Sequence, residues 1–294
     1  MDEREGYLLY RRVSRIGFPI TLIIVLIATS FLTVTYLQTG EFFERDISLA
    51  GGVTATFSTP DLVDTAALEQ EILDATGIQA RVRATAGAST QVVIESRIQE
   101  QERIDVLTDF ITDRFGIAYA DIGINFIGET LGASFFAETL IALLFAFMLM
   151  GLVILVIFRK WIVVSYMIFA AAADIIMTVF TVNMLGMQVS TGGLAAFLMI
   201  LGYSIDTDIL LTTKMLKKQK EPVESRFAEA FLTGMTMTGT SFVAVSIGAI
   251  VTNTPLIREI MVIIAIGLFF DAIITWFVNG HLVMRKLDSE VKRR

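Results

Sequence analysis

Six stretches of the chain are long and apolar enough to cross a lipid bilayer. They cover residues 16–37, 135–157, 161–183, 190–211, 236–254 and 257–282. A helix needs about 20 mostly apolar residues to span the hydrocarbon core. The first stretch is too long for the apolar segment of a signal peptide, and no small-residue cleavage site follows it. The pattern predicts a polytopic α-helical membrane protein with six transmembrane helices.

Residues 38–132, between the first two stretches, have a different periodicity. Short alternating or β-branched runs predict strands at 52–58, 78–85, 90–96 and 117–127. One helix is predicted from Asp64, as its N-cap, to Gly77, and a second ends before Gly116. The small residues at 86–89 predict a turn. The order β-α-β-β-α-β predicts an α+β ferredoxin-like domain.

Clusters of arginine and lysine fall on one side of the predicted membrane domain. They are Arg4, Arg11, Arg12 and Arg15; Arg159 and Lys160; Lys214, Lys217, Lys218, Lys220 and Arg226; and Arg285, Lys286, Lys292, Arg293 and Arg294. Basic residues concentrate in cytoplasmic segments. The predicted division is a cytoplasmic N-terminus at 1–15, a first helix at 16–37, an extracytoplasmic domain at 38–132, a five-helix membrane domain at 133–284 and a cytoplasmic tail at 285–294.

Residues 222–233 combine apolar Val223, Phe227 and Phe231 with polar Glu224 and Arg226. This pattern predicts an amphipathic helix lying at the cytoplasmic interface before the fifth span.

Composition agrees with an integral membrane protein, which we expect in the plasma membrane. Of 294 residues, 54% are hydrophobic and 18% charged, and the mean hydropathy is +0.69. Soluble domains carry about 25% charged residues. The absence of cysteine excludes disulfides and thiolate metal sites, and a single histidine excludes a multi-histidine zinc site. The net charge of −7 argues against nucleic-acid binding. Phosphate-binding loop motifs are absent, so nucleotide is not expected to supply energy on this chain. We expect no cofactor and no metal-ligating site residues.

The acidic excess is concentrated in the predicted outer domain. Residues 38–132 contain 16 acidic and 6 basic side chains. The acids are scattered over predicted helix faces, which favours a solvated acidic surface, and they form no catalytic constellation. We therefore expect a protein that is not an enzyme.

Four aspartates lie inside predicted spans: Asp174, Asp206, Asp208 and Asp271. Each costs about 2.5–3.5 kcal/mol at a helix centre on insertion scales, so it is a functional hypothesis by default. Asp174 and Asp271 are predicted at comparable depth. Asp206 and Asp208 are two residues apart and face nearly opposite ways on a regular helix. Asp206 shares its face with Gly202.

No lysine or arginine lies deep in any predicted span to neutralise these acids. A carboxylate in hydrocarbon takes up a proton or finds a cation. The counter-charge is therefore a proton, a metal ion such as sodium, or a basic side chain of another subunit. A simpler interpretation is an acid that hydrogen-bonds a neighbouring helix or reaches the headgroups. A proton, a metal ion or another subunit's basic side chain as the counter-charge would imply ion coupling or an obligate partner.

Four segments resemble motifs of the SecD/SecF family, in the resistance–nodulation–division superfamily. They are Leu49–Val53, Ile127–Gly132, Gly202–Asp208 and Thr240–Ser241. The motif positions are Gly51, Gly52, Gly128, Gly132, Gly202, Tyr203 and Ser204. With the topology, the resemblance covers nearly the whole chain and is closest to the SecF branch.

The chain departs from the bacterial motif in the fourth span. Thr207 stands where bacterial members of the SecF branch have aspartate, and Asp206 falls where SecD has one. The arginine that bacterial members carry before the Thr240–Ser241 motif has no counterpart between Thr233 and Ser241. These departures resemble an archaeal-type member.

The resemblance implies an auxiliary subunit of the Sec protein-export machinery. Such a subunit acts with SecD, associates with a SecYE-type channel, and uses the proton motive force or another ion gradient to promote preprotein translocation. Asp206 or Asp174 would then take up and release the proton. One alternative is a passive scaffold in the same machinery. The other is a proton-driven small-molecule or lipid exporter of the wider superfamily, for which a larger outer domain is expected.

Overall fold

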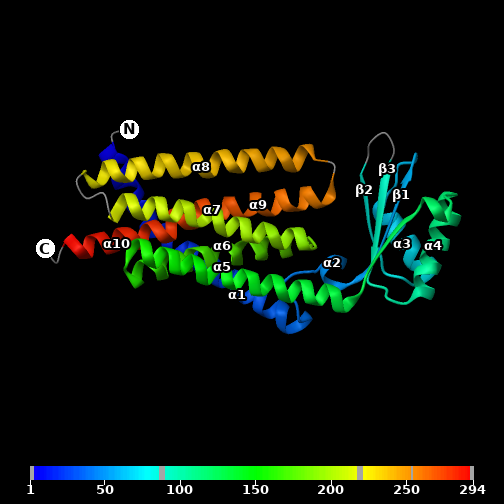
Figure 1. Ribbon diagram of the computed structural model, residues 1–294. Helices are drawn as coiled ribbons and strands as arrows, with labels where there is room; N and C mark the ends of the chain where they lie inside the picture. The colour runs from blue at the N-terminus through cyan, green and yellow to red at the C-terminus, as the bar shows by residue number, and fades with distance from the viewer. Residues whose placement is uncertain (1–2, 86–89, 217–220, 253, 292–294) are drawn as a thin grey trace. The chain divides into compact units, whose positions relative to one another are not determined.

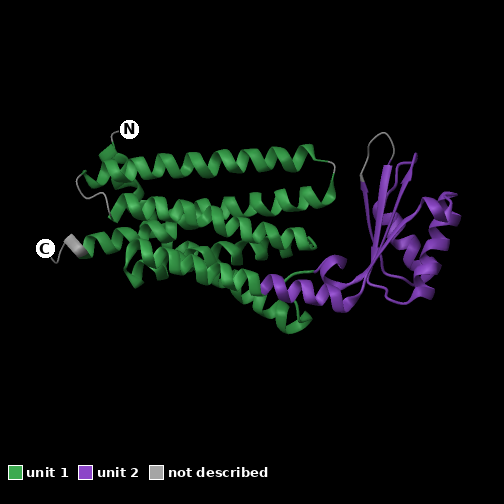
Figure 2. Cartoon of the chain, viewed as in Figure 1, with its two compact units in different colours: residues 1–44, 141–294 green, residues 45–140 purple. Residues whose placement is uncertain are grey.

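The computed structural model of the protein describes residues 3–85, 90–216, 221–252 and 254–291. The chain divides into a helical unit, residues 1–44 and 141–294, and a sheet unit, residues 45–140 (Figure 2). The predicted turn at 86–89 lies outside the described residues. So do the basic residues Lys217, Lys218, Lys220, Lys292, Arg293 and Arg294.

Six helices of the described chain are long and apolar enough to cross a membrane, which confirms the predicted number. They are α1 (Glu3–Thr39), α5 (Glu129–Phe158), α6 (Trp161–Met184), α7 (Thr191–Leu216), α8 (Val223–Val251) and α9 (Pro255–Ile274). The last continues through a π-helical turn, η2 (Thr275–Asn279), into α10 (Gly280–Val291). The two described ends of the chain lie at the same end of the helical unit (Figure 1).

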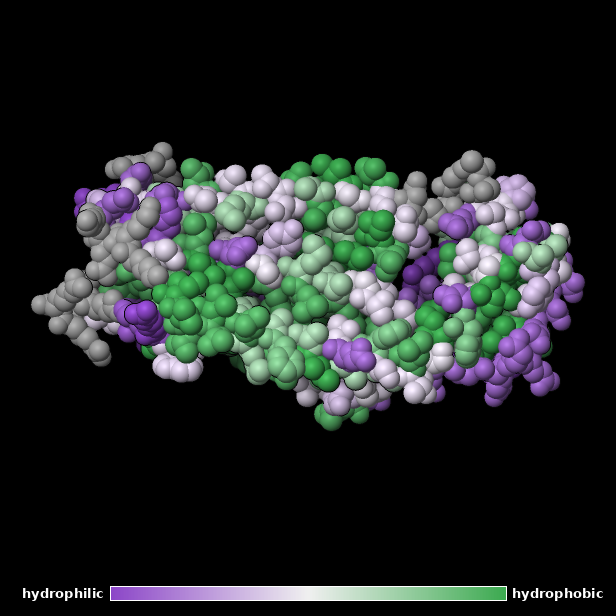
Figure 3. All heavy atoms as spheres, in the orientation of Figure 1, coloured by the Kyte–Doolittle hydropathy of each residue, from purple (hydrophilic) through white to green (hydrophobic). Residues whose placement is uncertain are grey.

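The helices of the bundle differ in how much of their surface is covered. Half of the apolar window of α6 and of α7 is buried, against 6% of the window of α5. Small residues let α6 approach α1 closely, because Ala170 and Ala173 pack against Val25 and Ala28. Apolar side chains dominate the visible flank of the helices, whereas hydrophilic ones gather over the sheet unit (Figure 3). The interior of the bundle is therefore centred on α6, α7 and α9.

The segment predicted as a separate interfacial helix is instead the first part of α8. Residues 223–251 form one helix without a break. No proline interrupts the sequence between Thr233 and Thr236, so nothing ends the helix there. Arg226, predicted on a polar face, is only 3% exposed and donates a hydrogen bond to the Met215 carbonyl at 2.5 Å.

The sheet unit contains four antiparallel strands in the order β2-β3-β1-β4. They are β1 (Gly52–Thr59), β2 (Arg81–Thr85), β3 (Thr90–Ser96) and β4 (Gly123–Ile127), with helices α3 (Thr65–Thr76) and α4 (Gln101–Phe115). Alternate residues of β1, including Ala55 and Phe57, point into a core shared with Ile72 of α3 and Ile111 of α4. Two short helices, α2 (Ile47–Ala50) and η1 (Tyr119–Asp121), were not predicted from the sequence.

The two helices of the sheet unit begin and end where their capping residues predict. The Asp64 carboxylate accepts hydrogen bonds from the backbone N–H groups of Ala66 and Ala67, at 3.1 and 3.2 Å. Gly77 and Gly116 end α3 and α4 with φ of 67° and 64°, a conformation that favours glycine. The predicted strand at 117–127 is shortened to β4, because η1 occupies its first half.

Candidate functional site

Three of the four intramembrane aspartates lie in the interior of the bundle. Asp174 comes from α6, Asp208 from α7 and Asp271 from α9, and all three are fully buried. We call these three residues the carboxylate cluster. Each lies on a different helix of the bundle interior, so the cluster depends on the packing of α6, α7 and α9 against one another.

Hydroxyl and amide groups hold the carboxylate cluster in place. The Thr275 hydroxyl lies 3.0 Å from Oδ1 of Asp208 and 3.2 Å from Oδ1 of Asp271. Asn279 donates from Nδ2 to Asp208 Oδ1 at 2.7 Å, and the Ser204 hydroxyl donates to Asp174. A hydroxyl carries one proton and cannot donate to two carboxylates at once. A fully bonded arrangement therefore needs one more proton shared by Asp208, Thr275 and Asp271.

The second oxygen of each carboxylate has no hydrogen-bond partner among the described residues. These oxygens are Oδ1 of Asp174, Oδ2 of Asp208 and Oδ2 of Asp271, and Oδ1 of Asn279 is also unsatisfied. In the described part of the chain, no lysine or arginine forms an ion pair with the cluster. Leaving a charged carboxylate buried and unpaired is costly. The geometry therefore accepts protons or a small cation.

The acids of the cluster do not form a multidentate metal site. The described residues contain no group of three or more His, Asp or Glu side chains placed to hold a metal ion. Hydroxyl groups of Ser204 and Thr275 lie beside the carboxylates instead. Such a chain of oxygens is suited to holding and passing protons.

The fourth aspartate lies apart from the carboxylate cluster. Asp206 is on the exposed side of α7, together with Gly202 and Tyr203, whereas Ser204 and Asp208 point into the bundle. A Cβ atom added at Gly202 would meet nothing within 4 Å. The structure thus separates the two acids of α7, as their spacing predicts, and leaves the Asp206 side open.

Thr275 and Asn279, the two residues that bind Asp208 from η2, were not predicted from the sequence. They follow Asp271 by four and eight residues in an otherwise apolar segment. This helical spacing was the signal in the sequence that could have placed them beside Asp271. A polar residue of moderate hydropathy does not stand out in a membrane span as an aspartate does.

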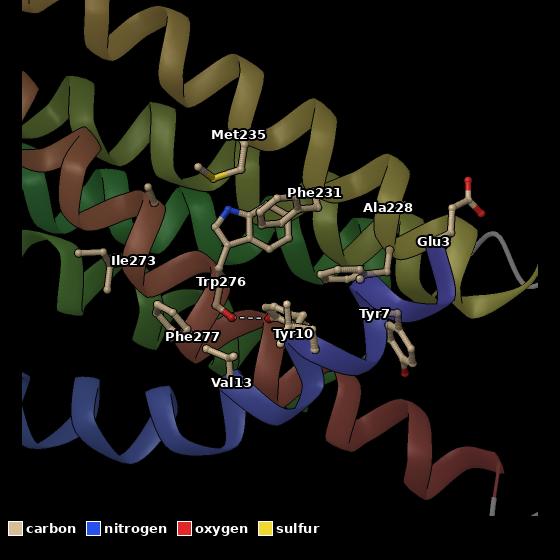
Figure 4. Close-up of a pocket in the computed structure, with 14 residues that line it drawn as sticks. Glu3, Tyr7, Tyr10, Val13, Ala228, Phe231, Met235, Ile273, Trp276 and Phe277 are labelled. Carbon is tan, nitrogen blue, oxygen red and sulfur yellow. Dashed lines mark hydrogen bonds between the residues drawn. The ribbon is translucent and has the colours of Figure 1, made fainter. Parts of the chain in front are cut away.

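An aromatic pocket adjoins the π-helical turn. This cavity of about 580 Å³ lies between α1, α8 and the segment around η2, and its lining includes Tyr7, Tyr10, Phe231 and Trp276 (Figure 4). The Tyr10 hydroxyl donates to the backbone carbonyl of Trp276. Trp276 directly follows Thr275, so a contact from α1 anchors the backbone beside the cluster.

Two of the glycine motifs meet inside the sheet unit. Gly51 has a φ of 81°, and a Cβ atom there would lie 2.6 Å from the Glu129 Cα. A Cβ atom at Gly132 would lie 2.9 Å from the Gly51 backbone nitrogen. A Cβ atom at Gly52 would lie still closer, 2.3 Å, to the Ser96 carbonyl oxygen, whereas a Cβ at Gly128 would meet nothing within 4 Å. The start of α5 therefore lies against the turn before β1, with no room for side chains between them.

The part of the chain that contains the carboxylate cluster matches a known protein family. The model described as "Protein export membrane protein SecD/SecF, C-terminal" matches residues 107–288. The chain belongs to the SecD/SecF family. The match includes Asp174, Asp208, Asp271 and the whole of η2.

Individual SecF proteins of archaea resemble the chain over most of its length. The protein-export membrane protein SecF of Methanolacinia petrolearia is 35% identical over 277 residues, covering 93% of each chain. SecF of Methanocaldococcus jannaschii is 30% identical over 277 residues, covering 91% of this chain and 93% of its own. These relatives confirm the resemblance to archaeal SecF that the four motifs indicated.

A solved member of the SecD/SecF family has the same fold. The crystal structure of SecDF from Thermus thermophilus, described as a translocon-associated membrane protein, aligns with a TM-score of 0.75 at 20% identity. The alignment covers 95% of this chain and 38% of SecDF. The chain thus spans less than half the length of SecDF.

Proposed function

We propose that the chain is the SecF-type subunit of a protein-export system and couples export to an ion gradient through the carboxylate cluster. The names of its archaeal relatives support a role in protein export. The observation that carries the coupling is the set of three buried carboxylates, each with an oxygen that nothing in the described chain satisfies. Buried acids with this property are typical of proton relays in membranes.

In the proposed mechanism, the proton moves along the oxygens that join α7 to α9. A proton on Asp208 or Asp271 completes the hydrogen bonds around Thr275, and its loss leaves two negative charges competing for one hydroxyl. Repulsion between them would weaken the contact of η2 with α7. The direct consequence is a movement of the segment that carries Thr275 and Asn279, which would be transmitted to the rest of the bundle.

We further propose that the sheet unit is a ferredoxin-like domain outside the cytoplasm and that both termini are cytoplasmic. The strand order β2-β3-β1-β4, with α3 and α4 as connections, supports the ferredoxin-like assignment. The basic clusters near the ends of α1 and α10 support the orientation. The 38% coverage of SecDF supports a separate SecD-type subunit as the partner that supplies the remaining length.

The exposed side of α7 is the proposed contact with the SecD-type partner. Met199, Gly202, Tyr203 and Asp206 lie on it, and the open space at Gly202 suits close approach of another helix. Asp206 would receive a hydrogen bond or a positive charge from that partner. Contacts with a SecYE-type channel and with preprotein are proposed from the family relationship alone.

The test is export of a secreted reporter in cells whose own copy of the chain is replaced by Asp174→Asn, Asp208→Asn or Asp271→Asn. We expect each variant to export as poorly as cells that lack the chain, because asparagine cannot take up and release a proton. Asp113→Asn, an exposed acid on α4, is the matched control and should export normally. Normal export by all three cluster variants would refute the coupling.

A passive scaffold is the second candidate, because Ser204, Thr275 and Asn279 also link α6, α7 and η2 by hydrogen bonds. A proton ionophore separates the two. If the chain couples export to protons, the ionophore removes the difference in reporter export between cells that have the chain and cells that lack it. If the chain is a scaffold, the difference in export persists in the absence of the gradient. The asparagine variants then export nearly as well as the unsubstituted chain.

A further inference from the structure

A second cavity, of about 420 Å³, lies between α1 and α10, and its charged residues are mostly basic. Arg11, Arg15, His281 and Arg285 line it, and Asp288 is its single acid. Arg11 forms an ion pair with Asp288, which occupies that carboxylate. In the described chain, Arg15 and Arg285 have no ion-pair partner. The cavity therefore holds two guanidinium groups with no counter-charge of their own.

The imidazole of His281 is fixed beside these two arginines. It stacks on the Phe18 ring with centroids 4.7 Å apart and an angle of 15° between the planes. Arg15 and Arg285 line the same cavity as this ring. Positive charges gathered in one cavity repel one another unless an anion binds between them. Arginine pairs and imidazole N–H groups are well suited to phosphate oxygens.

The cavity lies at the predicted ends of two apolar stretches. Arg15 directly precedes the first apolar stretch, and His281 lies at the end of the sixth. Further along α1, on the side that carries Arg15, Pro19 and Leu26 are exposed and could lie beside a hydrocarbon chain. Basic pockets between membrane helices at this level suit anionic lipid headgroups.

We propose that this cavity binds the phosphate of an anionic phospholipid headgroup. Arg15 and Arg285 hold the phosphate oxygens, and His281 donates a hydrogen bond to them. The lipid tail follows α1 into the bilayer. This site is separate from the carboxylate cluster and does not depend on ion coupling.

The full chain, purified in an uncharged detergent, tests the site by native mass spectrometry with phosphatidylglycerol or phosphatidylcholine of identical acyl chains. We expect one phosphatidylglycerol to be retained and phosphatidylcholine to be lost. In Arg15→Gln/Arg285→Gln, the affinity for phosphatidylglycerol should fall about thirtyfold. The matched control is Arg4→Gln/Arg12→Gln, which removes the same charge from α1 outside the cavity and should change the affinity less than twofold.

Three outcomes would overturn the proposal. The first is equal retention of the two lipids by the unsubstituted chain, which requires no variant to fold. The second is an equal loss of affinity in both double variants, which would indicate general surface attraction. The third is binding of inorganic phosphate alone as tightly as the lipid, which would make the cavity a site for a free anion. Retention of phosphatidylglycerol by Arg15→Lys/Arg285→Lys would support the proposal, because lysine also binds phosphate.

Discussion

Asp208 and Asp271 share a single hydroxyl group, that of Thr275, although they come from different helices. Asp208 Oδ1 also accepts a hydrogen bond from Nδ2 of Asn279 at 2.7 Å. The Thr275 hydroxyl, however, is the donor in contact with carboxylates of both α7 and α9. The charge state of one aspartate therefore determines whether the Thr275 hydroxyl can donate its hydrogen bond to the other.

Thr275→Val should impair export, because it removes the shared hydroxyl while keeping the shape of the side chain. Asp208 Oδ1 keeps its bond from Asn279, but Asp271 Oδ1 loses the bond from Thr275. An unsatisfied buried oxygen costs about 1–3 kcal/mol, so the thermal unfolding temperature should also fall. Thr275→Ser should restore both properties. Thr236→Val, which removes an exposed hydroxyl bonded to its own helix at Leu232, is the control. Export and stability in Thr275→Val equal to those of the control would contradict this role.

Arg226→Ala should destabilise the bundle by about 1–3 kcal/mol, measured by thermal unfolding in detergent. The Arg226 side chain is buried and donates to the Met215 carbonyl in the last turn of α7, where the helix dipole favours a positive charge. The comparison is Lys214→Ala, which breaks a more exposed ion pair with Glu229. Such pairs contribute about 0–1 kcal/mol. A larger effect at Lys214 than at Arg226 would show that this cap is unimportant.

Gly132→Ala should destabilise the sheet unit by about 1–3 kcal/mol, because its methyl group would lie 2.9 Å from the Gly51 nitrogen. The intrinsic helix preference of alanine works in the opposite direction by about 1 kcal/mol and does not relieve a clash with backbone. Gly128→Ala has open space around its Cβ and is the matched substitution. Thermal unfolding or limited proteolysis of the two variants would measure the difference. Equal stability would mean that the junction yields easily.

Tyr203→Cys should form a disulfide with a cysteine placed on a membrane helix of the SecD-type partner. The chain has no native cysteine, so the introduced thiol is the one reactive group on it. Phe145→Cys, on the exposed face of α5, is the control and should not cross-link to the same positions. Cross-linking of Phe145→Cys in place of Tyr203→Cys would place the partner on α5 and refute the proposed contact.

The elements that the sequence predicted correctly are those with local causes. Asp64 and Gly77 bound α3 because capping depends on a few neighbouring residues. The six spans follow from the length of the apolar stretches alone. The opposite orientations of Asp206 and Asp208 follow from the helix period.

The features that the sequence did not reveal depend on packing between distant segments. Thr275 and Asn279 reach Asp208 only because η2 and α7 pack side by side, and no local pattern announces that contact. Arg226 looked like part of a polar surface because its burial depends on α7 ending beside it. The motif glycines were recognisable in the sequence, but the fit of Gly132 against Gly51 required the fold.

The π-helical turn has a mechanical consequence. In η2 the Gly280 backbone N–H bonds to the Thr275 carbonyl five residues earlier, so this turn holds one residue more than an α-helical turn. Tightening it to α geometry would rotate everything beyond it by about 100°. Asn279 would swing away from Asp208, and α10 would turn with it. Under the proposed coupling, a single backbone register shift would convert the gain or loss of one proton into a rotation of α10.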